Sequence, residues 1–236
     1  MIKFSLTYFL QGCDYMKKSL SASLMCADLT NISPAFKVLE EAGIEYLHID
    51  IMDGAFVPNI TLGFDFVNAV KKATSIPLDV HMMVNKPIRF LERMNLDEND
   101  IVSVHYEADD NIEEALKAIR EMGVKSALAI NPTTPVEKVK DILQFADMLL
   151  VMTVTPGFAG QKMFKEAPEK VEEARKVLNE TGLSHIPIEV DGNISPVNAG
   201  LLCPRGADIF VLGTSALFLK DKSLADAARD FREVLV

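Results

Sequence analysis

The chain is poor in cysteine, lacks tryptophan and has no apolar run long enough to cross a membrane. Its three cysteines, at positions 13, 26 and 203, show no C-x-x-C spacing, and their odd number favours reduced thiols in a cytoplasmic protein. Basic residues are outnumbered, with 24 Lys and Arg against 34 Asp and Glu, which gives a net charge of −10. This balance argues against a nucleic-acid partner and against a phospholipid surface.

What is present predicts one globular α/β domain. Hydrophobic residues make up 49% of the 236 residues and charged residues 25%, which is typical of a soluble protein with a large core. The first residues read differently. Residues 2–10 are largely apolar, and Leu10-Gln11-Gly12-Cys13 faintly resembles a lipoprotein cleavage site, but this stretch is short for a signal peptide. We interpret residues 1–18 as an N-terminal extension, with Met16 as an alternative start, and residues 19–236 as a single domain.

Beyond residue 18, short apolar runs alternate with amphipathic stretches. The runs predict strands at 20–24, 46–51, 77–83, 101–105, 125–130, 148–153, 186–190 and 209–212. The amphipathic stretches predict helices at 34–41, 64–72, 111–121, 136–143, 166–179 and 224–234. Eight strands alternating with helices in one domain predict a (β/α)8 TIM barrel. An open doubly wound sheet is disfavoured because no G-x-G-x-x-G follows the first strand.

Polar side chains gather where the predicted strands end. Residues two apart on a strand share a face, so His48 and Asp50 project together from the second strand. Ser23, His81 and Asp191 end the first, third and seventh strands. Active sites of such barrels lie at this end, so these side chains converge, and two His with two Asp can hold a divalent ion such as Zn, Fe, Mn or Co.

Each of these signals also has an ordinary structural explanation. An isolated His-x-Asp pair often caps a strand end, and His81 alone is most simply a core histidine bonded to backbone. Their joint placement with Asp191 favours the site. Of the remaining histidines, His105 ends a strand and can brace the site, and we expect His185 in a solvated loop.

Glycine-bearing loops follow the sixth, seventh and eighth strands, at 157–160, 191–193 and 213–215. Barrel enzymes often bind phosphate in the loops after the seventh and eighth strands through backbone amides, so the acidic net charge does not exclude a phosphorylated ligand. Glycine lets the backbone approach an anion closely.

From about residue 19 onward the chain resembles the ribulose-phosphate 3-epimerase family. The matching stretches are Ser23 to Asp28, His48 to Asn59 (HIDIMDGAFVPN), His81 to Val84, Val151 to Gln161 (VMTVTPGFAGQ), Glu189 to Gly192 and Gly213 to Ser215. They span nearly the whole expected barrel in the family's order.

The resemblance implies reversible inversion at C3 of a small phosphorylated ketose. It implies one divalent metal ion (Zn, Mn, Co, Fe or Mg) on His48, Asp50, His81 and Asp191, with Asp50 and Asp191 as the two acid/base carboxylates. The substrate and phosphate contacts that it implies are Ser23, His81, Gly157, Phe158, Ala159, Gly160, Gln161, Gly192, Asn193, Gly213, Thr214 and Ser215. We expect Met52, Met83 and Met152 to line the site or simply to pack in the core. Family members are commonly dimers or hexamers, so the resemblance also implies a homo-oligomer.

Several positions depart from the common family pattern: Ala55, Ala159 and Asn193 replace a His and two Gly, Cys26 replaces a small polar residue, and Gly213-Thr214-Ser215 replaces Gly-Ser-Ala. The loops look more like the allulose-6-phosphate 3-epimerase branch. We therefore predict a D-allulose 6-phosphate 3-epimerase first and a D-ribulose 5-phosphate 3-epimerase as the alternative. A non-catalytic sugar-phosphate-binding barrel ranks lower. A decarboxylase ranks lower too, because Asp50-Ile51-Met52-Asp53 lacks the lysine of the usual Asp-x-Lys-x-x-Asp array.

Overall fold

The structure is a computed structural model that describes residues 18–108 and 111–235. The expected N-terminal extension lies outside the described residues apart from Lys18, and so do the apolar segment 2–10 and the lipoprotein-like tetrapeptide. The Lys18 ammonium donates to the Ala207 carbonyl (2.8 Å) and to Asp208 Oδ1 (2.8 Å). These contacts hold the start of the first strand beside the start of the last.

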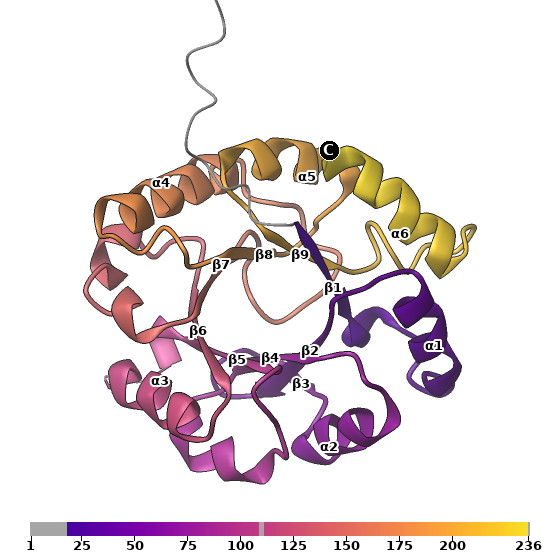
Figure 1. The fold of residues 1–236 in the computed structure, drawn as a ribbon, viewed down its shortest axis with the longest axis horizontal. Coiled ribbons are helices and arrows are strands. Elements are labelled where there is room, and N and C mark those ends of the chain that lie inside the picture. Colours follow the sequence, from indigo (N-terminus) through magenta and orange to yellow (C-terminus); the bar gives the residue numbers. More distant parts are fainter. Residues whose placement is uncertain (1–17, 109–110, 236) are drawn as a thin grey trace, which may run out of the picture.

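Eight parallel strands close into a barrel, surrounded by helices (Figure 1). They are β1 (Ser19–Ser23), β2 (Tyr46–Asp53), β4 (Leu78–Met83), β5 (Ile101–His105), β6 (Lys125–Ile130), β7 (Met148–Met152), β8 (Ile188–Asp191) and β9 (Ile209–Leu212). The order runs β1-β9-β8-β7-β6-β5-β4-β2, and β1 pairs with β2 to complete the ring. The predicted (β/α)8 barrel is confirmed.

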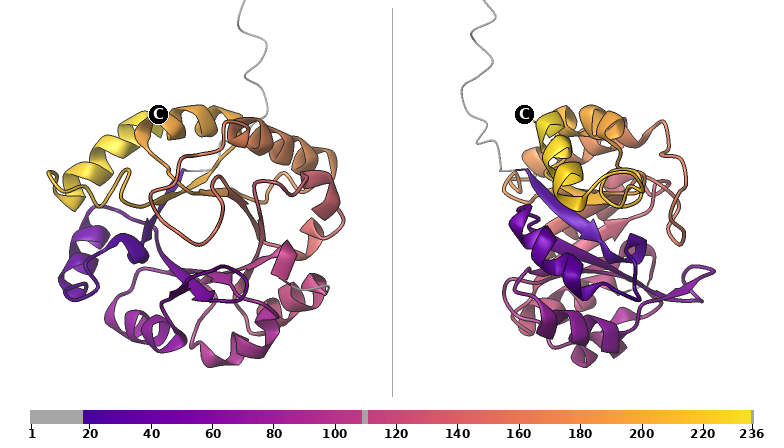
Figure 2. Two further views of the ribbon diagram at one scale, coloured as in Figure 1. Left: turned by 180° about the vertical axis from the view of Figure 1, so that it is seen from behind. Right: turned by 90° about the vertical axis from the view of Figure 1, so that its right-hand side faces the viewer.

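One further strand was not predicted. The two-residue β3 (Ile60–Thr61) pairs antiparallel with the end of β2 and forms a hairpin at the barrel rim. So short a strand carries no alternating pattern that a sequence could show. Figure 2 shows this hairpin and the loop after β7 on the same side of the barrel. The two are joined where Asn59 Nδ2 donates to the Gly157 carbonyl (2.8 Å).

The helices of the outer ring follow the sequence prediction at most places. The α-helices of the described residues are α1 (Ser33–Glu41), α2 (Phe64–Ala73), α3 (Ile112–Glu121), α4 (Ala167–Glu180), α5 (Pro196–Leu202) and α6 (Leu224–Arg232). The short α5 was not predicted, although its start has a local signal: Ser195 caps it by accepting the Asn198 N–H (3.2 Å), and Pro196 follows.

The helix predicted at 136–143 is wrong. The chain there forms two 3₁₀ turns, Val136–Val139 and Leu143–Phe145, and another 3₁₀ segment, Pro87–Arg93, follows β4. The apolar spacing was read correctly, since Val136, Val139 and Leu143 are all buried. A 3₁₀ turn advances about 2.0 Å per residue against 1.5 Å in an α-helix, so it suits the short connection between β6 and β7.

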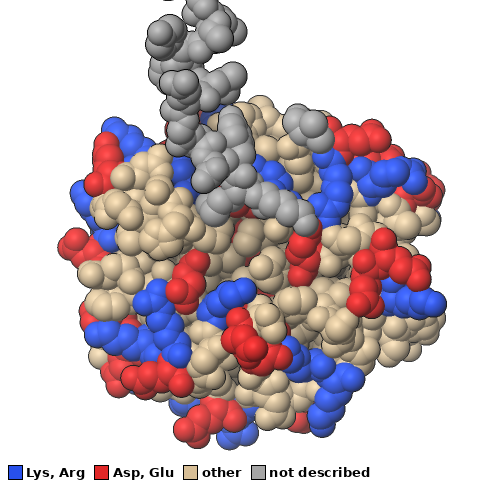
Figure 3. All heavy atoms as spheres, in the orientation of Figure 1, with Lys and Arg blue, Asp and Glu red and all other residues tan. Residues whose placement is uncertain are grey.

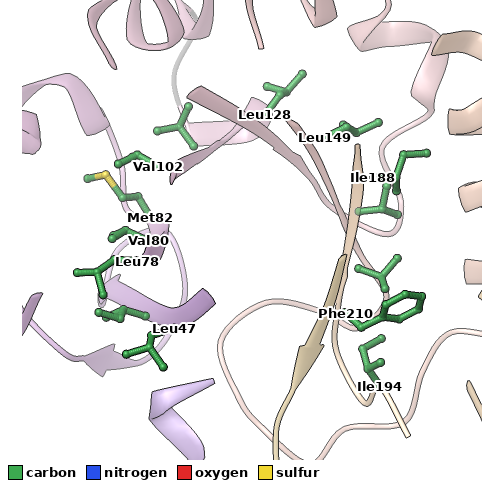
Figure 4. Close-up of a cluster of buried hydrophobic side chains, with 14 of the residues drawn as sticks. Leu47, Leu78, Val80, Met82, Val102, Leu128, Leu149, Ile188, Ile194 and Phe210 are labelled. Atoms are coloured by element: carbon green, nitrogen blue, oxygen red, sulfur yellow. The ribbon is translucent and has the colours of Figure 1, made fainter. Parts of the chain in front are cut away.

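Two separate layers of side chains build the core. Those on the outer face of the strands, such as Leu47, Leu128 and Phe210, point away from the barrel axis toward the helices (Figure 4). Inside the barrel, the amino ends of the strands are plugged by an apolar group: Tyr46, Ile101, Ala127, Met148 and Ile209. Inward positions recur every second residue, and beside and above this apolar group the interior also holds Ser21, His48, Asp79 and Glu189, all buried. The polar groups are therefore stacked directly below the mouth of the barrel.

No helix among the described residues is long and apolar enough to span a membrane. Over the face drawn in Figure 3, Lys and Arg alternate with Asp and Glu, and no broad basic area is visible.

Phe210 tests the packing of the barrel against its helices. Its side chain is fully buried and meets the Phe231 ring of α6 edge-on, with ring centroids 6.1 Å apart. We expect Phe210→Ala to lower the free energy of unfolding by about 3–5 kcal/mol in urea titrations, through lost burial and a residual cavity. Phe164→Ala, at a side chain that is 40% exposed, is the control and should cost less than about 1 kcal/mol. Equal losses would contradict this packing.

Candidate active site

The site is built on neighbouring strands of the closed sheet. Strand β2 carries His48 and Asp50 inward, and the register of β2 with β4 sets Asp50 beside His81. Strand β8 ends with Asp191, opposite Met152 of β7. The four residues predicted as metal ligands thus meet at the carboxyl ends of β2, β4 and β8.

Their donor atoms are close enough to share one ion. Asp50 Oδ1 lies 3.3 Å from both His48 Nε2 and His81 Nδ1. Asp191 Oδ2 lies 4.0 Å from His48 Nε2 and 3.8 Å from His81 Nδ1. Two ligands that are each about 2.1 Å from a metal stand about 3.0–3.5 Å apart at octahedral or tetrahedral angles. Three of the four residues are buried, and the group could hold a metal ion.

A second observation supports the fit. Nε2 of His48 is buried and makes no hydrogen bond to any described residue. Its other ring nitrogen, Nδ1, lies 2.5 Å from Asp79 Oδ2, which also accepts the Ser21 hydroxyl (2.9 Å). A carboxylate that accepts Nδ1–H orients Nε2 toward Asp50, the arrangement usual for a metal-binding histidine, in which a metal ion takes the place of the Nε2 proton. The chemistry of the set, two imidazoles and two carboxylates, suits several divalent ions.

Asp79 is a site residue that was not predicted. It is fully buried beneath the four predicted ligands. Its position was readable, because Asp79 lies two residues before His81 and therefore shares its face of β4. Nothing in the sequence, however, shows that β2 and β4 are aligned so that Asp79 reaches His48.

Glu189 was missed in the same way, two residues before Asp191. It is fully buried, and burial together with the charge of Asp79 raises its pKa well above the usual range. As carboxylates, Glu189 and Asp79 would have no donor between them. Neither carboxyl oxygen of Glu189 has a hydrogen-bond partner among the described residues, and a proton on Glu189 would relieve its repulsion with Asp79. The raised pKa of Glu189 favours its protonated form beneath the site.

The two acid/base candidates differ in their electrostatics. Burial raises the pKa of Asp50, but the charge of His48, with help from His81, outweighs it and holds that pKa well below its usual range. For Asp191, burial prevails over the attraction of His48 and raises the pKa to about 6. One carboxyl group is thus firmly ionised while its neighbour exchanges a proton near neutral pH.

A cavity of about 570 Å³, including its open mouth, lies above these groups. Every predicted site residue except His48 and His81 lines it, and these two histidines lie buried below its floor. Met52, Met83 and Met152 combine both expected roles, since they line the cavity and are themselves buried. Its remaining lining residues were not predicted: Met25, Cys26, Val154, Pro156, Ile194 and Val211.

The loops after β7, β8 and β9 form the other end of the cavity. Gly157 and Gly192 have φ of 122° and 118°, which non-glycine residues rarely adopt. Gln161 donates to the carbonyls of its own loop at Thr155 (2.6 Å) and Phe158 (2.9 Å). It therefore braces that loop.

Two departures from the family pattern contact each other. Asn193 has a left-handed backbone with φ of 52°, a conformation that asparagine tolerates better than most residues. Its Oδ1 accepts the Ser215 hydroxyl at 2.9 Å, which ties the loop after β8 to the loop after β9. Ala55 is different: it is exposed and does not line the cavity. It therefore gives no support for an altered pocket at that position.

The other two histidines lie where the sequence placed them. His185 is exposed in the turn before β8. His105 is fully buried at the end of β5, with Nε2 at 2.8 Å from His81 Nε2. Burial lowers the pKa of His105 to about 4, so its ring is neutral.

Fold and site together show a (β/α)8 barrel with imidazoles and carboxylates gathered at the carboxyl ends of its strands, the usual place of the active site in such barrels. Residues 19–218 match the sequence profile of the Ribulose-phosphate 3 epimerase family, and the chain belongs to this family. It is accordingly an isomerase of the class that epimerises carbohydrates.

Relatives with curated names support the same family. A ribulose-phosphate 3-epimerase of Bacillus subtilis (strain 168) is 37% identical over 206 residues, which cover 87% of this chain and 95% of the relative. One from Chlamydia pneumoniae is 40% identical over 215 residues, 89% of this chain and 93% of the relative. A chloroplastic ribulose-5-phosphate-3-epimerase of Arabidopsis thaliana is 36% identical over 204 residues, which cover 86% of this chain and 72% of the relative.

Solved structures of lower identity share the fold. A 3-hexulose-6-phosphate synthase aligns with a TM-score of 0.62 at 17% identity, over 92% of this chain and all of that chain (100%). Orotidine 5'-phosphate decarboxylase from Pyrococcus horikoshii OT3 aligns with a TM-score of 0.64 at 14% identity, over 92% of this chain and 98% of that chain. These similarities show the barrel alone.

Gly192 tests the geometry of the cavity loops. A Cβ at this position would lie 2.5 Å from Val154 Cγ2, whereas one at Gly160 would meet nothing within 4 Å. Both glycines have positive φ, so the backbone cost of alanine, about 1–2 kcal/mol, applies to each. We expect Gly192→Ala to be less stable than Gly160→Ala by a further 1–3 kcal/mol or so, measured by urea unfolding. Equal stability of the two variants would contradict the close approach.

Proposed function

We propose that the protein is a divalent-metal-dependent 3-epimerase that interconverts D-ribulose 5-phosphate and D-xylulose 5-phosphate. The observation that carries the proposal is the pair of carboxyl groups at the cavity floor, Asp50 and Asp191, in contact with His48 and His81. Inversion at a carbon next to a carbonyl group requires that a proton leave one face and that a proton return to the other. Two carboxyl groups, one with a depressed and one with a raised pKa, are suited to that task.

The electrostatics assign the first roles. Asp50, with its depressed pKa, is ionised and accepts the C3 proton, while Asp191, with a pKa near 6, delivers a proton to the opposite face. In the reverse direction the two residues exchange roles. The Ser23 hydroxyl donates to Asp50 Oδ2 (3.2 Å), which fixes the orientation of that carboxylate.

His48, Asp50, His81 and Asp191 would hold the metal ion. When bound, a divalent ion stabilises the negative charge that develops on the ketose oxygens as C3 loses its proton. The protein supplies the water-poor surroundings. Met52, Met83 and Met152 cover the floor of the cavity with weakly polar thioethers and leave little room for solvent beside the carboxylates.

The phosphate group would occupy the end of the cavity lined by the loops after β7, β8 and β9. Support comes from the positive-φ glycines in the first two of these loops and from the usual phosphate position in such barrels. Asn193 adds a side-chain donor there. Because its Oδ1 already accepts from Ser215, its Nδ2 is the group available to a ligand.

The five-carbon substrate replaces the six-carbon ketose that the sequence analysis placed first. Relatives that cover most of the chain carry the ribulose-phosphate name, and Ala55, one of the departures from the family pattern, does not line the cavity. A barrel that binds sugar phosphate without turnover is not retained, since the chain belongs to a family of epimerases. The expected homo-oligomer and the cytoplasmic location remain predictions.

Steady-state kinetics test the proposed substrate. With Zn²⁺, Mn²⁺, Co²⁺ or Mg²⁺ supplied, we expect kcat/KM for D-ribulose 5-phosphate to exceed that for D-allulose 6-phosphate, in line with the names of the relatives. A higher kcat/KM for D-allulose 6-phosphate would instead support the six-carbon substrate. Failure to turn over either ketose with any of these ions would overturn the proposal itself.

Asp191→Asn separates catalysis from binding. The amide cannot accept or deliver the proton, so kcat should fall by about 10²- to 10⁴-fold. Binding of inorganic phosphate, measured by calorimetry, should remain close to that of the wild type, because the phosphate loops are unchanged. Asp65→Asn, at an exposed carboxylate on α2, is the matched control and should leave both quantities unaltered. Parallel loss of kcat and phosphate binding would instead assign Asp191 a structural role.

A further inference from the structure

A buried hydrogen-bond chain leads away from the site through β5. His81 uses Nδ1 toward Asp50, and its other ring nitrogen, Nε2, lies 2.8 Å from Nε2 of His105. Nδ1 of His105 in turn lies 3.1 Å from Glu107 Oε2. Both imidazoles are fully buried and their rings are stacked, with centroids 5.0 Å apart. The proposed function uses neither His105 nor Glu107.

The contacts of Glu107, at the far end of this hydrogen-bond chain, fix which atom donates in the Glu107–His105 and His105–His81 hydrogen bonds. Glu107 Oε1 accepts the backbone N–H of Asn131 (3.0 Å) and the Thr134 hydroxyl. A carboxylate held by these donors can only accept from His105, so His105 carries its proton on Nδ1. Nε2 of His105 then has a lone pair and must accept from His81. His81 therefore carries a proton on Nε2, so Nδ1, which faces Asp50 and Asp191, is the nitrogen through which it would bind a metal ion.

We propose that His105 and Glu107 are positioning residues that hold His81 in the tautomer able to bind a metal ion through Nδ1. The proposal rests on the proposed metal-dependent function, which names His81 as a ligand. It assigns to an imidazole relay the task that the Asp79 carboxylate performs directly for His48. The two metal-binding histidines would thus be oriented from opposite sides of the site by different devices.

The loop that binds Glu107 at the end of the hydrogen-bond chain is itself held in place. The loop that presents the Asn131 N–H is bound by Lys170 of α4, whose ammonium donates to the carbonyls of Asn131 (2.6 Å) and Pro132 (3.0 Å) and to that of Thr134. On its open side, His105 is covered by the Phe56 ring, with centroids 4.8 Å apart. Water therefore has little access to replace either partner of His105.

Glu107→Gln gives the sharpest test. The fixed N–H of Asn131 attracts the new amide oxygen, which leaves the amide NH₂ facing His105 Nδ1. The relay then reverses: His105 donates from Nε2, and His81 is left with its proton on Nδ1, where the metal should bind. We expect Zn²⁺ and Co²⁺ affinity, measured by chelator competition, to fall about 10- to 100-fold. Long-range ¹⁵N NMR of the imidazoles should show the changed tautomer of His81.

The comparison with Glu107→Ala separates positioning from simple support. A role in stability alone predicts that the near-isosteric Gln is mild and that Ala is harmful. The relay predicts that Gln weakens metal binding at least as much as Ala, although Gln retains more stability in urea unfolding. Ser103→Ala, at a buried serine on the same strand, is the control and should bind metal as the wild type does.

The outcomes distinguish this inference from the function on which it rests. If the wild-type protein binds metal and epimerises its substrate while Glu107→Gln binds metal equally well, the relay is wrong and the function stands. Unchanged His81 tautomers in Glu107→Gln would also overturn the relay. If the wild type binds none of the divalent ions, the proposed metal-dependent function fails first.

Discussion

Because β1 pairs with β9 on one side and with β2 on the other, the eight parallel strands have no free edge, and every second side chain must point into a closed interior. That closure sets Ser23 beside His48, while the neighbouring β2–β4 register sets Asp50 beside His81. The same alternation buries apolar residues at the amino ends of the strands and leaves polar ones toward the mouth. The site is thus a consequence of strand register, and a shift by one residue would turn its groups outward.

The cost of that arrangement is the burial of many ionisable groups. An isolated charge in such surroundings costs several kcal/mol, so each group needs an opposite charge or a proton. The interior satisfies this need along one line across the barrel: Glu189, Asp79, His48, Asp50, His81, His105 and Glu107 follow one another in contact. The raised pKa of Glu189 and the neutral ring of His105 limit the net charge of this line. The negative Asp50 beside two imidazoles is the point at which a divalent ion fits.

Much of this was readable from the sequence because it depends on local periodicity. The alternation in Tyr46 to Asp53 gave the strand, and strand ends in a barrel gave the convergence of Ser23, Asp50 and Asp191. The groups that were missed, Asp79 and Glu189, depend on which residues of neighbouring strands lie opposite each other, and no single sequence shows that register. The helix prediction for residues 136–143 was wrong for another reason. The apolar spacing of this segment suits either an α-helix or 3₁₀ turns, and only the length that the connection must cover decides between them.

Proton exchange at C3 is the chemistry that the account assigns to Asp50 and Asp191, and it can be observed directly. D-Ribulose 5-phosphate incubated in D₂O with the metal-loaded protein should equilibrate with D-xylulose 5-phosphate, and ¹H NMR should show deuterium at C3 of the product. Formation of the epimer with its original C3 hydrogen retained, or no epimer at all, would contradict the account.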